Sequence, residues 1–175
     1  MNIRKAVLSD LDAVERIYDK IHRAEEQGLQ TIGWIRGIYP VRDTALKAYE
    51  RNDLFVLEDK GRICGTAIIN QTQVDSYQLG DWKYKVSKEQ VCVLHTLVID
   101  PECAGHGYGR AFIHFFETYA LEQGCIELRI DTNAKNKAAR RMYHKHGYDE
   151  IGIVPTDFNG IPDIQLVLLE KNLKK

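Results

Sequence analysis

The segment from residue 91 to residue 131 constrains the fold more than any other part of the chain. Val91–Ile99 is nearly continuous apolar sequence, which is typical of a strand covered on both faces. Aromatic residues follow at helical spacing from Phe112 to Tyr119, and apolar residues then alternate from Ile126 to Ile130, as in a second strand. A strand, a helix and a strand in this order form a crossover connection, so the sequence predicts that the two strands pair in parallel.

The remaining elements place this crossover in a larger mixed sheet. Helices separated by strands predict an α/β (α+β) fold with helices on both faces of the sheet. The 175 residues are expected to form one domain, 1–175. The residue patterns predict five further strands, at 3–6, 54–58, 63–73, 148–154 and 161–169, with helices at 10–26, 41–51 and 136–146 and irregular loops at 28–40 and 74–88.

The composition excludes several classes of protein. Lys plus Arg number 24 and Asp plus Glu number 25, so the chain lacks the positive field that drives non-specific nucleic-acid binding. No apolar run approaches the roughly 20 residues that span a bilayer, and the first residues lack a signal-peptide pattern. The four cysteines have neither CxxC spacing nor histidines at ligand spacing. We therefore expect a cytoplasmic protein with reduced thiols, no metal, and neither nucleic acid nor membrane as a partner.

A glycine-containing loop follows the first strand of the crossover and is a candidate phosphate site. Gly105-His106-Gly107-Tyr108-Gly109-Arg110 leads directly into the helix. Glycines let backbone N–H groups turn toward a ligand, and the helix adds its own unpaired N–H groups and the positive end of its dipole. Such an arrangement suits a pyrophosphate. The alternative is a glycine-rich turn before a core helix; the spacing matches neither a nucleotide P-loop nor a Rossmann fingerprint.

Two segments resemble the GNAT family of acetyltransferases. Asp100-Pro101 and the alternating glycines resemble the family's acetyl-CoA-binding motif, with Gly107 and Gly109 at its glycine positions and Ala104 where Arg or Gln is usual. The second segment, Asn136–Tyr148, resembles the family pattern Asn-x-x-Ala-x-x-x-Tyr-x-x-x-Gly-Phe, and its matching residues are Asn136, Ala139, Tyr143 and Gly147, with Tyr148 in place of Phe.

The resemblance implies a fold and a cofactor site. It implies a mixed, mostly antiparallel central sheet in which the parallel strands 91–99 and 126–131 splay apart around acetyl-CoA. The backbone of the first strand would pair with the pantetheine arm, and the glycine-loop amides would hold the pyrophosphate. The cofactor-binding residues expected from the resemblance are Leu97, Val98, Ile99, Ala104, Gly105, His106, Gly107, Tyr108, Gly109, Arg110 and Asn136.

The resemblance also suggests catalytic residues. Tyr143 would be the general acid that protonates the departing CoA thiolate; considered alone, it would be a core tyrosine beside Met142. His95 would be the general base, and strand alternation would put it on one face with Leu97 and Ile99. The alternative for His95 is a buried histidine satisfied by a backbone partner. His106 is a weaker candidate, expected to be exposed.

The expected reaction is direct transfer of an acetyl group to the primary amine of a small molecule. Acceptor specificity should come from the loops 28–40, 74–88 and 156–161, which carry aromatic residues. A protein or peptide amine is the alternative acceptor, and a CoA-binding regulatory module without turnover is the non-enzymatic alternative. The chain could also form a homodimer by pairing of the closing strand, 161–169, across an interface.

Overall fold

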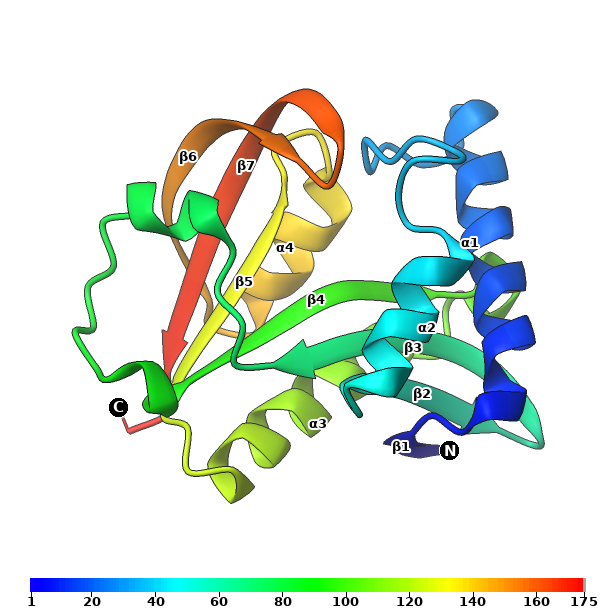
Figure 1. Ribbon diagram of the computed structural model, residues 1–175, viewed down its shortest axis with the longest axis horizontal. Coiled ribbons are helices and arrows are strands. Elements are labelled where there is room, and N and C mark those ends of the chain that lie inside the picture. The colour runs from blue at the N-terminus through cyan, green and yellow to red at the C-terminus, as the bar shows by residue number, and fades with distance from the viewer. Residues whose placement is uncertain (175) are drawn as a thin grey trace.

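The computed structural model describes residues 1–174, and within them one sheet carries the fold (Figure 1). Its seven strands are ordered β1-β2-β3-β4-β5-β7-β6. Every neighbouring pair is antiparallel except β4–β5, so the predicted parallel crossover is confirmed. The strands are β1 (Asn2–Lys5), β2 (Leu54–Asp59), β3 (Arg62–Asn70), β4 (Val91–Ile99), β5 (Glu127–Asn133), β6 (Asp149–Phe158) and β7 (Ile161–Asn172).

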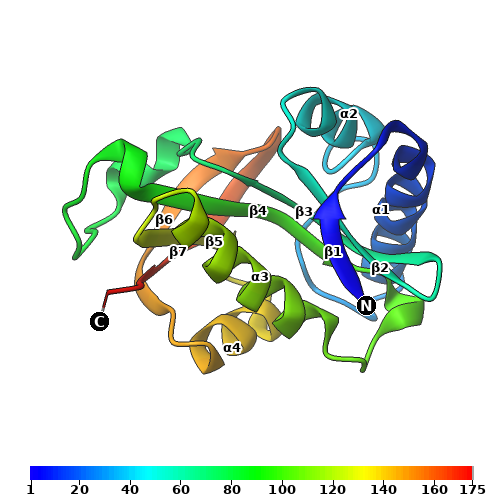
Figure 2. The same ribbon diagram turned by 90° about the horizontal axis from the view of Figure 1, so that it is seen from below.

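Helices cover both faces of the sheet, as predicted (Figures 1 and 2). α1 (Leu11–Glu26) and α2 (Arg42–Glu50) lie on one face, where α1 buries one stripe against β2 and β3. α3 (Tyr108–Glu122) and α4 (Lys137–Lys145) lie on the other face, over the largest buried cluster. Burial of this apolar surface on both sides is the main contribution to the stability of the fold.

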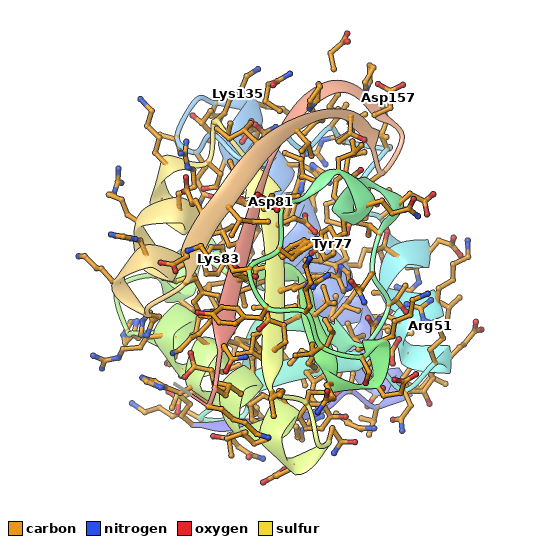
Figure 3. The ribbon with its side chains drawn as sticks, turned by 90° about the vertical axis from the view of Figure 1, so that its left-hand side faces the viewer. Arg51, Tyr77, Asp81, Lys83, Lys135 and Asp157 are labelled. Atoms are coloured by element: carbon orange, nitrogen blue, oxygen red, sulfur yellow. The ribbon has the colours of Figure 1, made fainter. Side chains whose placement is uncertain are left out.

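The segment 71–90 covers the part of the sheet that α1 and α2 leave open. The sequence predicts a loop here, and the structure adds two short 3-10 turns, Asp75–Leu79 and Lys88–Gln90. Tyr77 and Trp82 pack over apolar residues of β4 and β7. The indole ring of Trp82 stacks on the Arg129 guanidinium at 3.9 Å. The segment is therefore anchored to β5 (Figure 3).

β4 and β5 separate halfway along their length. Their parallel ladder runs from Val91↔Glu127 to Leu94↔Ile130, and both strands continue beyond it. β4 bulges at the same point: Thr96 has φ 49°, and the register with β3 shifts by one residue between Ile68↔His95 and Thr66↔Val98. A positive φ is unusual for a β-branched residue. The splayed pair implied by the family resemblance is therefore present.

The bulge corrects one expectation about β4. His95 was expected on the same face as Leu97 and Ile99, but the extra residue at Thr96 reverses the alternation. Leu97 and Ile99 pack toward α3. His95 instead lies with the preceding odd-numbered residues on the opposite face, where it meets Asn70 and Thr72 of the β3 end.

The closing strands also differ from expectation. β6 extends through Pro155, which the sequence pattern placed between strands, and β7 runs on to Asn172. Pro155 is tolerated because β6 is an edge strand, whose outward N–H groups need no partner. β7 lies between β5 and β6, and both of its edges are paired from Leu166 to Glu170. That stretch therefore has no free edge for the expected pairing across a dimer interface.

Two carboxylates and a guanidinium lie beneath the 71–90 segment. Glu127, Arg129 and Glu170 are all buried. Within residues 1–174, Glu127 Oε1, Arg129 Nε and Glu170 Oε2 have no hydrogen-bond partner. Burial and the adjacent Glu170 carboxylate raise the pKa of Glu127 to about 8. Glu127 therefore carries a proton in the folded chain at neutral pH.

We expect Glu127 to make stability depend on pH. Its folded-state pKa exceeds the unfolded value of about 4.3, so the folded state binds more protons between these limits. The free energy of unfolding should then fall as pH rises from about 5 to about 8. Urea unfolding of Glu127→Gln should show a flatter dependence than the parent, and exposed Glu122→Gln should match the parent. An equal slope in parent and Glu127→Gln would contradict the assignment.

Candidate active site

A cavity of about 1290 Å³ occupies the space where β4 and β5 separate. Single small-molecule sites typically have about 300–1,000 Å³, so this cavity has room for two substrates. Residues of the glycine loop and α4 line one part of it. Residues of the 29–34 loop, the β3 end and the β6–β7 hairpin line the other.

The glycine loop meets the requirements of a pyrophosphate site. Gly105 and Gly107 have φ values of 82° and 76°, and α3 begins immediately afterwards at Tyr108. This backbone directs successive N–H groups and the helix N-terminus to one side. A Cβ on Gly109 would lie 2.9 Å from the Met142 sulfur, so glycine is needed for the close approach of α3 and α4.

Most of the predicted cofactor-binding residues line this cavity. They are Leu97, Val98, Ile99, Ala104, Gly105, Gly107, Tyr108, Gly109, Arg110 and Asn136. Beyond Leu94, the edge of β4 that faces β5 has no ladder partner in the described part of the chain, which leaves backbone groups of Leu97 and Ile99 for a ligand. Asn136 also caps α4, because its side-chain oxygen accepts from the Ala139 N–H at 3.1 Å.

His106 is the exception, because it does not line the cavity. It is exposed, as expected, and its ring stacks on Tyr108 with centroids 5.4 Å apart. The Tyr108 hydroxyl donates to Asp59 at 2.8 Å. The side chains of these two residues are therefore directed away from the cavity, and only their backbone groups are suited to phosphate binding.

Tyr143 projects from α4 into the cavity. Only 5% of the residue is exposed, and its ring packs edge-on against Tyr148. Its hydroxyl has no hydrogen-bond partner within residues 1–174 and is not among the fully enclosed polar atoms. Burial, and then the charge of Asp131, hold the pKa of this phenol well above its usual value, so it keeps its proton at neutral pH. A phenol in this state can donate to a developing anion.

Asp131 is a site residue that the motif analysis missed. It follows the last β5 residue paired to β4 and lines the cavity. Burial raises the pKa of its carboxyl group to about 6. The Tyr77 hydroxyl, from the 71–90 segment, donates to Asp131 Oδ2 at 2.8 Å. The available signal was its position at the carboxyl end of a parallel strand, where α/β proteins place ligand sites.

His95 lines the cavity with a constrained ring. Its Nε2 lies 3.2 Å from Asn70 Oδ1 and 3.1 Å from the Thr72 carbonyl oxygen. Carbonyl and amide oxygens are both acceptors, so Nε2 carries the hydrogen and Nδ1 is the unprotonated nitrogen. Burial lowers the pKa of His95 to about 4, so the ring is neutral at physiological pH.

Two segments close the cavity on the side away from the glycine loop. The 28–40 loop is held by Glu25, whose carboxylate accepts from the N–H groups of Ile32 at 2.6 Å and Gly33 at 2.9 Å. Ile38 of this loop touches the tip of the β6–β7 hairpin, 3.3 Å from where a Cβ on Gly160 would stand.

Aromatic residues of the same loop form the wall. Trp34 and Tyr39 pack edge to face with centroids 5.9 Å apart, and both line the cavity. The Tyr39 hydroxyl bonds the Thr96 hydroxyl at the bulge. Trp34 and Tyr39 therefore form an aromatic wall of the cavity, and Tyr39 lies close enough to Asp131 to feel its charge.

Within residues 1–174, no group of three or more His, Cys, Asp or Glu side chains is arranged to hold a metal ion. No helix in this range combines the length and apolar character needed to cross a bilayer. Cys103 lines the cavity, whereas Cys92 does not.

Comparison with known proteins gives consistent results. The family model described as the acetyltransferase (GNAT) family matches residues 14–148. An uncharacterised N-acetyltransferase of Methanocaldococcus jannaschii is 24% identical over 87% of this chain, which spans 62% of that relative's length. The uncharacterised N-acetyltransferase YhfO of Bacillus subtilis is 25% identical over 86% of this chain and 91% of its own length.

Solved structures share the fold. A GNAT-family acetyltransferase of Streptococcus agalactiae has a TM-score of 0.80 and 21% identity, covering 99% of this chain and 96% of its own. The acetyltransferase yncA of Salmonella typhimurium, solved with acetyl-CoA, has a TM-score of 0.70 and 21% identity, covering 100% and 95%. Because the family model covers most of the sequence, the chain belongs to the GNAT family of acetyltransferases, which use acetyl-CoA.

Proposed function

We propose that this chain transfers the acetyl group of acetyl-CoA directly to the primary amine of a small molecule. The observation that carries the proposal is one cavity that is lined by the glycine loop and also by Tyr143 and Asp131. The proximity of Ile38 to the hairpin tip favours a small molecule over a peptide, because it narrows the space that an extended chain would need. Retention of Tyr143 in the cavity favours turnover over a silent CoA-binding module.

On the donor side, the chain supplies backbone groups. The free edge of β4 at Leu97 and Ile99 suits the amide-bearing arm of CoA, much as an added strand pairs with a sheet edge. The N–H groups from Gly105 to Arg110 suit the pyrophosphate, and Asn136, which caps α4, lines the same cavity. Ala104 supplies no charged side chain, so binding there depends on the backbone.

On the acceptor side, Asp131 is the better base. An amine is protonated at neutral pH and must lose a proton before or during attack. With a pKa of about 6, the Asp131 carboxyl group is ionised at pH 7.5 yet basic enough to take that proton. His95 has one basic nitrogen, Nδ1, and a pKa near 4 makes it a weaker base.

The chemical step then needs one acid. As the amine nitrogen forms its bond to the thioester carbon, the carbon–sulfur bond breaks and negative charge develops on sulfur. Asp131 takes one proton from the ammonium group before attack, Tyr143 donates its phenolic proton to the sulfur, and the second nitrogen proton leaves to solvent as the amide forms. The products are the amide and free CoA thiol, and both residues recover their starting states through solvent.

Tyr143→Phe should separate binding from turnover. Loss of a general acid lowers the rate by about 10²-fold or more, whereas acetyl-CoA affinity should stay near that of the parent. Calorimetric titration with acetyl-CoA measures the affinity. Release of CoA thiol with a panel of small amines and of peptides measures turnover and distinguishes the two acceptor classes.

Tyr119→Phe is the matched control, because Tyr119 is an α3 tyrosine outside the cavity. It should behave as the parent in both measurements. Equal turnover by Tyr143→Phe and the parent would remove Tyr143 from the mechanism, and absence of acetyl-CoA binding by the folded parent would refute the proposed function.

Asp131→Asn and His95→Gln should identify the base. If Asp131 is the base, the rate falls as pH drops through about 6, because protonation removes the acceptor for the amine proton. Asp131→Asn should lower turnover by about 10²–10⁴-fold and abolish the fall in rate near pH 6. His95→Gln should still show that fall. A fall in the parent's rate near pH 4 that disappears in His95→Gln would assign the base to His95 instead.

Tyr77→Phe should shift the pH at which the rate falls on the acid side, without abolishing that fall. The Tyr77 hydroxyl bonds the ionised carboxylate and so opposes the effect of burial on the pKa of Asp131. A hydrogen bond to a charged group contributes about 1.5–3 kcal/mol, or about one to two pKa units. A carbon-13 NMR titration of the Asp131 carboxyl group should show an upward shift of that size in Tyr77→Phe and none in Tyr49→Phe. An unchanged titration would show that Tyr77 does not support the carboxylate.

A further inference from the structure

Cys64 and Cys103 are 39 residues apart in the sequence, but their sulfurs are only 2.8 Å apart in the structure. That distance is shorter than van der Waals contact between two sulfurs. It exceeds the covalent bond length of about 2.05 Å by about 0.8 Å. Cys64 belongs to β3, and Cys103 ends the 3-10 turn Pro101–Cys103, which leads into the glycine loop.

The backbone fixes both cysteines at this separation. The Asp100 N–H donates to the Cys64 carbonyl oxygen at 2.9 Å, and the Cys103 N–H donates to the Asp100 carbonyl oxygen at 2.8 Å. The Asp100 side chain is in turn held by Lys20 and Arg62, both within 2.9 Å. The pair is therefore built into the frame that supports the glycine loop.

The two thiols differ in their position relative to the cavity. Both residues are buried, with 6% of Cys103 and 4% of Cys64 exposed, but only Cys103 of the two lines the cavity. Burial raises the pKa of the Cys64 thiol to about 12, which disfavours its thiolate. A small oxidant entering the cavity therefore meets Cys103 first. Cys92 and Cys125 are a second pair of neighbours, but neither lines the cavity.

We propose that Cys64 and Cys103 are a modification site that a small peroxide entering the cavity converts to a reversible disulfide. In the first step the Cys103 sulfur takes one oxygen from hydrogen peroxide, which gives a sulfenic acid and one water. In the second step the Cys64 sulfur attacks the Cys103 sulfur. The S–S bond forms, the S–O bond breaks, and a second water leaves with the Cys64 proton. Two thiols are oxidised and one peroxide is reduced.

The location links this modification to substrate. Under the proposed function, acetyl-CoA fills the part of the cavity through which peroxide reaches Cys103, so bound cofactor should shield the pair. The disulfide would tie the end of the turn to β3 beside the glycine loop. A dithiol reductant would reverse it.

Peptide mapping of the whole parent protein tests the pair. The protein is treated with hydrogen peroxide, quenched, unfolded in urea and alkylated. We expect the loss of two alkylatable thiols, a Cys64–Cys103 cross-link that dithiothreitol reverses, and full alkylation of Cys92 and Cys125. Trypsin leaves Cys92 and Cys103 on one peptide, 89–110, so tandem mass spectrometry must locate the linkage.

Single-site variants assign the order of the two steps. Cys64→Ser should form no cross-link and should accumulate a Cys103 sulfenic acid that dimedone traps. Cys103→Ser should lose no thiol at Cys64. Over-oxidation of Cys103 in the parent without a cross-link, or preferential oxidation of Cys92 and Cys125, would overturn the proposal.

Repeating the oxidation in the presence of CoA tests whether peroxide enters through the cavity. CoA at 100 times its dissociation constant leaves about 1% of the protein free, so cross-linking should slow by up to about 100-fold. An unchanged rate, with CoA binding demonstrated by calorimetry, would refute entry through the cavity. If calorimetry detects no binding, the proposed function fails, and the mapping without CoA still decides whether the disulfide forms.

Discussion

The structure depends on the point at which the β4–β5 ladder ends. Four residue pairs hold these strands together in parallel, and the bulge at Thr96 then turns β4 away from its neighbour. A β-branched residue with a positive φ is unfavourable by itself, so the surrounding packing must hold it there. The separation of the two strands creates a cavity inside the sheet. Unpaired strand backbone lines one edge of this cavity, and α3 starts at its end. The cavity residues on β4, β5 and α4 owe their positions to this separation.

The acceptor side depends on an element far from it in the sequence. Asp131 stands at the edge of the cavity, and its carboxylate is positioned by Tyr77, which lies 54 residues earlier. Tyr77 is in turn held by Trp82, whose ring stacks on Arg129 two residues before Asp131. The 71–90 segment thus contacts β5 at two positions on the same face. A segment whose regular structure is limited to two short 3-10 turns therefore positions a carboxylate of the cavity through a buried, well-packed side chain.

Much of the fold could be predicted because the sequence pattern matches the local requirement. The apolar run from Val91 to Ile99 matches β4 residue for residue, and the parallel crossover followed from the order of elements. The bulge at Thr96 could not be predicted, because it depends on pairing with β3 rather than on any property of threonine. Proline at 155 suggested a break, but an edge position removes the penalty that would have caused one.

The same distinction between a local sequence pattern and packing in three dimensions applies to the site. The glycine loop and Tyr143 carry local motifs, whereas Asp131 acquires its environment from Tyr77 and the Cys64–Cys103 pair arises only in three dimensions. Only four residue pairs join β4 to β5, as few as join β1 to β2 at the edge of the sheet and fewer than join any other neighbouring strands. A molecule bound along the free edge of β4 would act as a missing strand between the two halves. The substrate would then be part of the architecture, and the folded chain would be more rigid when loaded than when empty.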